Sequence, residues 1–158
     1  MRNDAHSAAR PMWSAERSAL VADVLRQAGH LRLRVHGESM LPSLWPGDIV
    51  EIASCSMEDV RPAEIVLAAR EGRLFLHRVI APCTPNGFRL RGDSMPACDP
   101  QYPAEALLGR LVRRSDGRRR LSSTTPLRTT LSRALGALLC HCGVARRLAL
   151  KFQSRRRS

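Results

Sequence analysis

Lysine is almost absent from this chain, and its absence limits the chemistry that the side chains can support. Of 26 basic residues only Lys151 is a lysine, and it lies in a polar, arginine-rich tail. We therefore do not expect catalysis by a lysine amine in the body of the protein. Long apolar runs are absent too. The longest uncharged stretch of the tail, residues 134–145, has 12 residues, whereas a helix that crosses a bilayer needs ~20.

Two further absences concern the cellular compartment and metals. No N-terminal segment has the pattern of a cleavable signal peptide, and the five cysteines include no Cys-x-x-Cys pair. Residues 140–142, Cys-His-Cys, are potential ligands, but neighbouring residues of a helix point in different directions and a tetrahedral site needs four ligands. We therefore expect free thiols, no metal, no cofactor, and a protein that is cytoplasmic or peripherally membrane-associated.

The positive charge is confined to one end of the chain. The formal net charge of +12 would by itself suggest nucleic-acid binding. Residues 1–109 hold 12 arginines and 13 carboxylates, whereas residues 110–158 hold 13 arginines, one lysine and one aspartate. The body is therefore nearly neutral. With 158 residues, 44% of them hydrophobic, it has the size and composition of one domain with a single core.

Hydrophobic periodicity predicts a mainly β protein with a compact antiparallel β domain. Residues 14–29 have the apolar spacing of a short helix that ends at Gly29. From Leu31, apolar and polar residues alternate with the period of a half-buried strand. Further short strands, each bounded by turn residues, are predicted at residues 48–52, 64–69, 73–81, 88–91 and 107–112.

The chain is predicted to have four segments. They are an N-terminal tail and short helix (1–29), the β domain (30–113), a polar linker (114–126) and a basic amphipathic C-terminal helix and tail (127–158). The last segment has a stripe of leucines among its arginines. Such a helix suits adsorption to an anionic membrane surface, and it equally suits packing on the body with a solvated arginine face.

Side chains suited to catalysis gather in three short segments of the β domain. Ser39 follows a strand in a glycine-containing turn, where a hydroxyl can be exposed and a backbone N–H left free for a carbonyl oxygen. A serine hydroxyl needs a base to become a nucleophile. Without lysine, His77 in its apolar strand is the best candidate, with Asp99 or Asp93 to orient it, as in a catalytic triad. The alternative is that His77 is a core histidine without a chemical role.

These segments resemble, in order and spacing, the sequence boxes of the signal peptidase I family, whose clan includes the self-cleaving SOS-response repressors. Residues 37–50, Gly-Glu-Ser-Met-Leu-Pro-Ser-Leu-Trp-Pro-Gly-Asp-Ile-Val, are similar to the nucleophile box. Residues 76–80, Leu-His-Arg-Val-Ile, are similar to the box of the general base, which is usually lysine in bacterial signal peptidases and histidine in the endoplasmic-reticulum and archaeal types. Residues 92–99 resemble the third, acidic box, and residues 108–112 the closing strand.

The resemblance implies the catalytic β domain of that clan and a serine endopeptidase that cleaves a leader or signal peptide from a peptide or preprotein substrate. It makes Ser39 the nucleophile, with its own N–H in the oxyanion hole, and His77 the general base. Asp99 would orient His77, and Asp93 is the second choice, with a role in holding the turn as its alternative.

The sequence also departs from that family. Signal peptidases normally carry a transmembrane anchor, and none is found here. Only about ten residues separate the second box from the third, so the large extra β domain of many bacterial enzymes is missing. These differences bear on location and substrate more than on chemistry.

Two other functions compete with the peptidase. One is a non-catalytic binding module of the same fold, whose tail binds anionic membrane or nucleic acid, and it would be favoured by Ser39 and His77 lying too far apart to hydrogen bond. The other is a self-cleaving repressor. It fits poorly, because those proteins have a serine–lysine dyad behind a helix-turn-helix domain. Here the body has no lysine, and only one short helix precedes the β domain. We do not expect nucleic acid as a partner, since composition alone is weak support for it.

Overall fold

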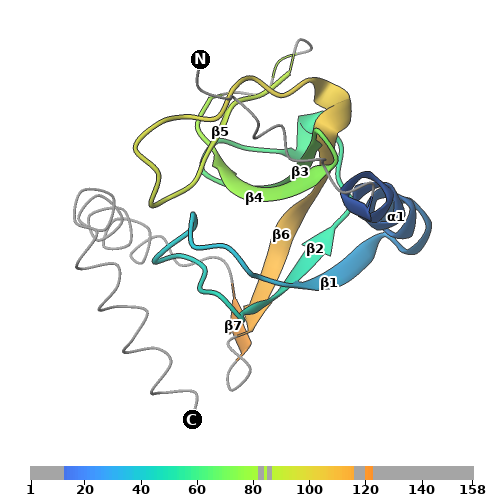
Figure 1. Ribbon diagram of the computed structural model, residues 1–158, viewed down its shortest axis with the longest axis horizontal. Helices are drawn as coiled ribbons and strands as arrows, with labels where there is room; N and C mark the ends of the chain where they lie inside the picture. The colour runs from blue at the N-terminus through green and yellow to red at the C-terminus, as the bar shows by residue number, and fades with distance from the viewer. Residues whose placement is uncertain (1–12, 82–83, 85–86, 116–119, 123–158) are drawn as a thin grey trace, which may run out of the picture.

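An N-terminal helix and one antiparallel sheet are the main elements of the computed structural model, which describes residues 13–81, 84, 87–115 and 120–122 (Figure 1). Helix α1 (Trp13–Ala28) ends where Gly29 adopts a φ of 74° and donates its N–H to the Leu25 carbonyl at 2.9 Å. Glycine reaches this left-handed conformation without the steric cost of a Cβ. The predicted helix, with its end at Gly29, is confirmed.

All strand pairings in the sheet are antiparallel. The strands are β1 (His30–Arg34), β2 (Ile49–Ala53), β3 (Ile65–Arg70), β4 (Arg73–Val79), β5 (Leu90–Arg91), β6 (Leu107–Ser115) and β7 (Arg120–Ser122). Their order is β1-β2-β6-β3-β4-β5, and β7 also pairs with β6. Two short 3-10 helices, η1 (Met57–Asp59) and η2 (Ala104–Ala106), lie in the connections. Figure 1 shows a curved sheet with α1 beside β1.

The described part of the chain is thus mainly β, as predicted, but some boundaries differ. The strand predicted at residues 88–91 is reduced to Leu90–Arg91, because Phe88 instead forms an isolated bridge with Tyr102. The sheet also continues beyond residue 113. Strand β6 runs to Ser115, and β7 pairs with it from within the stretch predicted as a linker. The predicted C-terminal helix of residues 127–158 lies outside the described residues.

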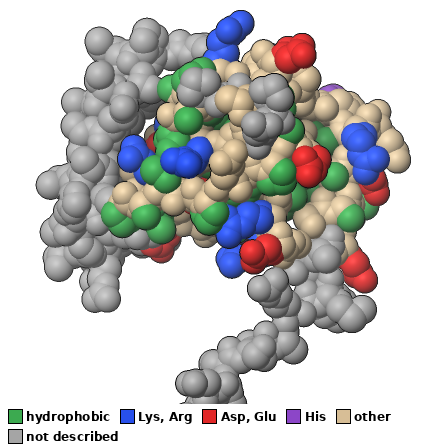
Figure 2. Space-filling model, turned by 90° about the horizontal axis from the view of Figure 1, so that it is seen from above, with side chains coloured by type: hydrophobic (Ala, Val, Ile, Leu, Met, Phe, Trp, Pro, Cys, Tyr) green, Lys and Arg blue, Asp and Glu red, His purple; other side chains and the backbone are tan. Residues whose placement is uncertain are grey.

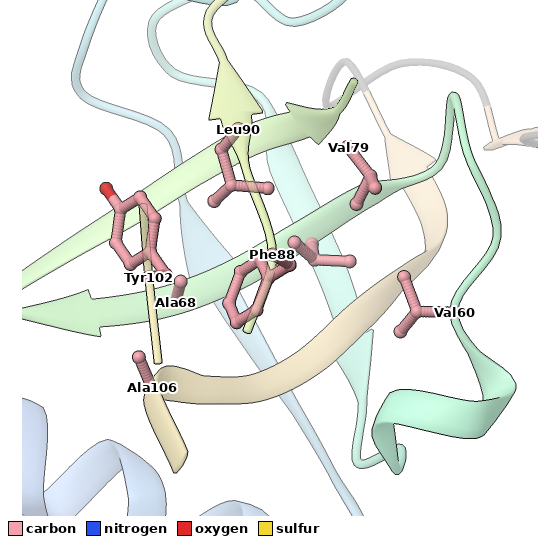
Figure 3. Packing of buried hydrophobic residues seen from close by; sticks show 8 residues of the cluster. Val60, Ala68, Val79, Phe88, Leu90, Tyr102 and Ala106 are labelled. Atoms are coloured by element: carbon pink, nitrogen blue, oxygen red, sulfur yellow. The ribbon is translucent and has the colours of Figure 1, made fainter. Parts of the chain in front are cut away.

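Two buried apolar clusters lie on opposite faces of β3. Alternate residues of a strand point to opposite sides, so Val66 and Ala68 belong to one cluster and Leu67 to the other. The first cluster consists of Val60, Val66, Ala68, Val79, Phe88, Leu90, Tyr102 and Ala106 (Figure 3). The second consists of Leu25, Met40, Leu44, Val50, Ile52 and Leu67. The sheet is therefore covered on both faces at its centre.

The surface carries charges of both signs. On the face shown in Figure 2, acidic and basic side chains are interspersed among apolar ones. Glu51, for example, lies 3.5 Å from Arg32 and 3.8 Å from Arg113. Exposed pairs of this kind stabilise a fold by at most ~1 kcal/mol each. Within the part of the chain that the structure describes, no helix has the length and apolar character needed to span a membrane.

Candidate active site

Ser39 lies in a turn that the apolar core holds in place. The turn connects β1 to β2, and the side chains that follow Ser39 are buried, with Met40 2% and Leu41 0% exposed. The Leu44 N–H donates to the Met40 carbonyl at 2.9 Å, and the Leu41–Pro42 peptide bond is cis. The residues beside Ser39 therefore anchor the turn, while Ser39 itself stays partly exposed. Met40 thus has a packing role.

A second loop binds the backbone around Ser39. The buried Ser94 donates its N–H to the Ser39 carbonyl at 2.9 Å and its hydroxyl to the Glu38 carbonyl at 2.8 Å. Gly92 lies so close that a Cβ built on it would stand 3.0 Å from the Ser39 Cβ. The loop after β5, which is distant in the sequence, therefore contacts the Ser39 turn directly and fixes its position.

His77 reaches Ser39 from the middle of β4. Its Nε2 lies 2.8 Å from the Ser39 hydroxyl oxygen. The histidine is 6% exposed, it is paired in register with Val66 of β3, and its ring lies 5.9 Å from the Phe75 ring. A central strand and an apolar surrounding therefore restrict the orientation of the imidazole, as the apolar sequence around it predicts.

Asp99 binds the other ring nitrogen of His77. Its Oδ2 lies 2.6 Å from Nδ1, and its own N–H donates to the Leu90 carbonyl at 2.8 Å, which ties this loop to β5. The Tyr102 hydroxyl donates to the same Oδ2 at 3.4 Å. Burial, together with the negative charge of Asp99, raises the pKa of Tyr102 to about 12, so the phenol remains a donor at neutral pH.

Asp93 has a different partner. It accepts two hydrogen bonds from Arg78, from Nε at 2.7 Å and from Nη2 at 2.6 Å, and a third from the Ser43 hydroxyl. Arg78 also donates to the Ala63 carbonyl at 2.6 Å. Such two-point arginine–carboxylate pairs fix geometry as well as charge. Because Arg78 follows His77 and Ser43 belongs to the Ser39 turn, this cluster links all three segments of the site.

Asp48 closes the same turn on its far side. Its carboxylate is 1% exposed, accepts the Trp45 N–H at 2.8 Å and lies 2.9 Å from the Nε of Arg114 on β6. Gly47 before it has a φ of 87°, which a residue with a side chain rarely adopts. Asp48 therefore shapes the turn that leads into β2.

The arrangement is suited to nucleophilic catalysis. A neutral His77 that donates from Nδ1 to Asp99 has a lone pair on Nε2 directed at the Ser39 hydroxyl, which it can deprotonate. Among the described residues, no backbone carbonyl accepts the Ser39 N–H. That N–H is the donor which, in a serine hydrolase, would bind the oxyanion that forms on a carbonyl carbon bonded to Ser39 Oγ.

Of the four residues selected from the sequence, three lie together and one does not. Ser39, His77 and Asp99 form a single hydrogen-bonded chain, whereas Asp93 binds Arg78. The structure thus assigns the partner of His77 to Asp99, and Asp93 takes the turn-holding role that was its alternative.

Several residues around the site had no role predicted from the sequence: Ser43, Arg78, Gly92, Ser94 and Tyr102. Arg78 could have been suspected, because it lies in the same short segment as His77 and a charged residue in an apolar strand needs a partner. Tyr102 is the only tyrosine of the chain and lies three residues after Asp99. That proximity was its only signal.

No cluster of potential metal ligands lies at this site among the described residues. In the described ranges, no three His, Cys, Asp or Glu side chains are grouped so that they could hold a metal ion. The Cys-His-Cys segment at residues 140–142 lies outside those ranges. No protein-family model and no curated protein sequence matches the chain.

Proposed function

We propose that this protein is a serine endopeptidase of the signal peptidase I type, with the catalytic β domain of that clan. The proposal joins two independent lines of support. One is the resemblance of the three sequence segments to the boxes of that family. The other is the meeting of the candidate nucleophile, base and acid in one place, although residues 39, 77 and 99 lie far apart in the sequence. The substrate we propose is a peptide or preprotein.

The observation that carries the proposal is the position of His77 between Ser39 and Asp99. Both ring nitrogens are engaged, at 2.8 Å and 2.6 Å, by the partners that a general base requires. A core histidine without a chemical role also needs hydrogen-bond partners, but buried groups can serve as such partners. The partly exposed Ser39 hydroxyl is instead where a substrate could reach it. A non-catalytic module would be favoured by a gap between Ser39 and His77, and the two are within hydrogen-bond distance.

The proposed reaction proceeds through an acyl-enzyme. Ser39 Oγ attacks the scissile carbonyl carbon while its proton passes to His77 Nε2, and the Ser39 N–H stabilises the oxyanion. The C–N bond then breaks, and the imidazolium returns the proton to the departing amine. A water molecule, deprotonated by His77, hydrolyses the ester and regenerates Ser39. Asp99 stabilises the imidazolium in both halves of the reaction.

Covalent labelling tests this function without a known substrate. A fluorophosphonate probe should form a Ser39 Oγ–P bond with loss of fluoride and a proton, and Ser39→Ala and His77→Ala should each abolish labelling. Ser54→Ala and His36→Ala are matched controls, because both residues are exposed and neither belongs to the triad. They should label like the wild type.

A signal peptidase inhibitor of the lipopeptide type provides a second probe, because this family often resists generic serine reagents. Labelling or inhibitor binding that requires both Ser39 and His77 supports the proposal. Labelling that persists in Ser39→Ala overturns the assignment of the nucleophile. A folded wild-type protein that neither reacts with the probe nor binds the inhibitor overturns the peptidase function itself.

A further inference from the structure

We propose that Tyr102 is a positioning residue of this site, which acts on His77 through Asp99. The proposal rests on the serine-peptidase function proposed above. It extends the hydrogen-bonded chain from Ser39, His77 and Asp99 to a fourth side chain that comes from the buried core and not from the surface of the site.

Tyr102 and His77 donate to the same oxygen atom of Asp99, and this shared acceptor supports the role. Asp99 Oδ2 accepts from His77 Nδ1 at 2.6 Å and from the Tyr102 hydroxyl at 3.4 Å. A carboxylate with one donor can rotate about its Cβ–Cγ bond, whereas two donors on the same oxygen restrict that rotation. Tyr102 therefore limits the orientations from which Asp99 can hold the imidazole.

Tyr102 is itself held rigidly enough to impose an orientation. Its side chain is 1% exposed and belongs to the first core cluster, where Figure 3 shows the ring beside Phe88 and Leu90 with the hydroxyl at the outer end. The rings of Tyr102 and Phe88 stack with centroids 5.4 Å apart, and the two backbones exchange hydrogen bonds of 2.9 Å. Stacked, backbone-paired aromatic residues of this kind are well fixed in a core.

The charged groups around the phenol act in opposite directions on its pKa: Asp99 raises it and Arg70 lowers it, and burial together with Asp99 outweighs Arg70, so the phenol remains a donor. Arg70 of β3 lies over the Tyr102 ring, 5.6 Å from its centroid, and is paired with Glu71 at 3.7 Å. Asp99 accepts the hydrogen bond of the phenol, and His77 of β4 contacts the same carboxylate oxygen. A phenol that keeps its proton can only donate toward a carboxylate, which has no proton to return.

Removal of the hydroxyl alone has a defined consequence for the base. Tyr102→Phe keeps the ring, its stacking on Phe88 and the position of Arg70 over the ring. It removes the hydroxyl's hydrogen bonds with Arg70 and with Asp99, so that Oδ2 keeps the imidazole as its one donor. The carboxylate then turns more freely and presents more of its charge to His77. We expect acylation by the fluorophosphonate probe to slow about tenfold, and its loss at acid pH to begin at a higher pH than in the wild type.

The experiment compares wild type, Tyr102→Phe and Val60→Ala over a range of pH. Val60 belongs to the same core cluster, and among the described residues no hydrogen bond joins it to Ser39, His77 or Asp99, so Val60→Ala controls for lost stability. It should lower the unfolding temperature without moving the pH at which labelling declines. A Tyr102→Phe protein whose labelling rate and pH dependence equal those of the wild type overturns the proposal.

A second readout separates this proposal from the proposed function. The Nδ1 proton of His77 can be followed by NMR in the resting protein, without probe or substrate. In Tyr102→Phe it should exchange with water several times faster than in the wild type, whereas Val60→Ala should leave it unchanged. Faster exchange supports the positioning role even if the wild type never reacts with the probe, and unchanged exchange counts against it whether or not the protein is a peptidase.

Discussion

Gly92 lies directly against Ser39. A Cβ built on Gly92 would stand 2.6 Å from the Ser39 carbonyl oxygen, closer than packed atoms allow, and 3.0 Å from the Ser39 Cβ, which is tighter than most packed contacts. The Ser39 carbonyl is also the acceptor of the Ser94 N–H. The close approach of these two loops, which needs a residue without a side chain, therefore sets the position of the candidate nucleophile relative to the rest of the site.

Gly92→Ala should reduce reactivity far more than an alanine elsewhere in the site. The new methyl group has to displace the backbone of Ser39, which yields less easily than the flexible end of a side chain, so the position of Ser39 relative to His77 must change. We expect fluorophosphonate labelling to fall about a hundredfold, since small misplacements of reacting groups have effects of that size, and stability to fall by about 1–3 kcal/mol.

Gly37→Ala is the matched control for this variant. Gly37 precedes Ser39 by only two residues, yet a Cβ built on it meets nothing within 4 Å. It should label and unfold like the wild type. If Gly92→Ala reacts as fast as Gly37→Ala, the close packing against Ser39 has no part in placing the hydroxyl.

Asp99→Asn should abolish reactivity and leave the fold intact. An amide in place of the carboxylate no longer stabilises the imidazolium, and it can donate to Nδ1 and so favour the wrong tautomer of His77. The expected loss in labelling rate is about 10³- to 10⁴-fold, as in other triads. Circular dichroism and the unfolding temperature should stay near those of the wild type. Rapid labelling of Asp99→Asn would show that His77 does not depend on this carboxylate.

Asp93→Asn should have the complementary effect. It removes the charge that binds Arg78, whose side chain is only 16% exposed, and an uncompensated, mostly buried guanidinium is costly. We expect the free energy of unfolding to fall by about 2–4 kcal/mol, as measured by chemical denaturation. Protein that remains folded should keep a measurable labelling rate, in contrast to Asp99→Asn. Equal stability of the Asp93→Asn and wild-type proteins would refute a structural role for this pair.

The contrast between Asp93 and Asp99 shows where sequence reasoning stops. Both carboxylates belong to one short loop. The family resemblance ranked Asp99 first, but the residue types and their spacing left both open, because the choice depends on which one the loop turns toward His77. The N–H of Asp99 bonds to Leu90, while Asp93 faces Arg78. Sequence spacing could identify the loop, but only the folded path of the chain assigns a partner to each carboxylate.

Local signals predicted the elements that depend on local physics. Gly29 ends α1 because of its own backbone freedom, and the alternation from Leu31 predicted β1 correctly. Pairing between distant segments was missed. Strand β7 exists because residues 120–122 find a partner in β6, and Phe88 leaves the expected strand to pair with Tyr102. A polar composition around β7 gave no sign of that pairing.

The ionisation of Tyr102 can be measured directly, because it is the only tyrosine of the chain. Its pKa in the folded protein is raised to about 12 by burial and by the charge of Asp99, whereas an unfolded chain has the ordinary value of ~10. Since the folded state holds this proton more tightly, the contribution to stability is complete below pH ~10 and is lost as the pH rises from there toward 12. Tyrosinate absorbance should therefore appear only near pH 12, or together with unfolding, while denatured protein should titrate near ~10. Tyr102→Phe should lack the signal, and a midpoint near ~10 with circular dichroism still native would mean that the phenol is open to water.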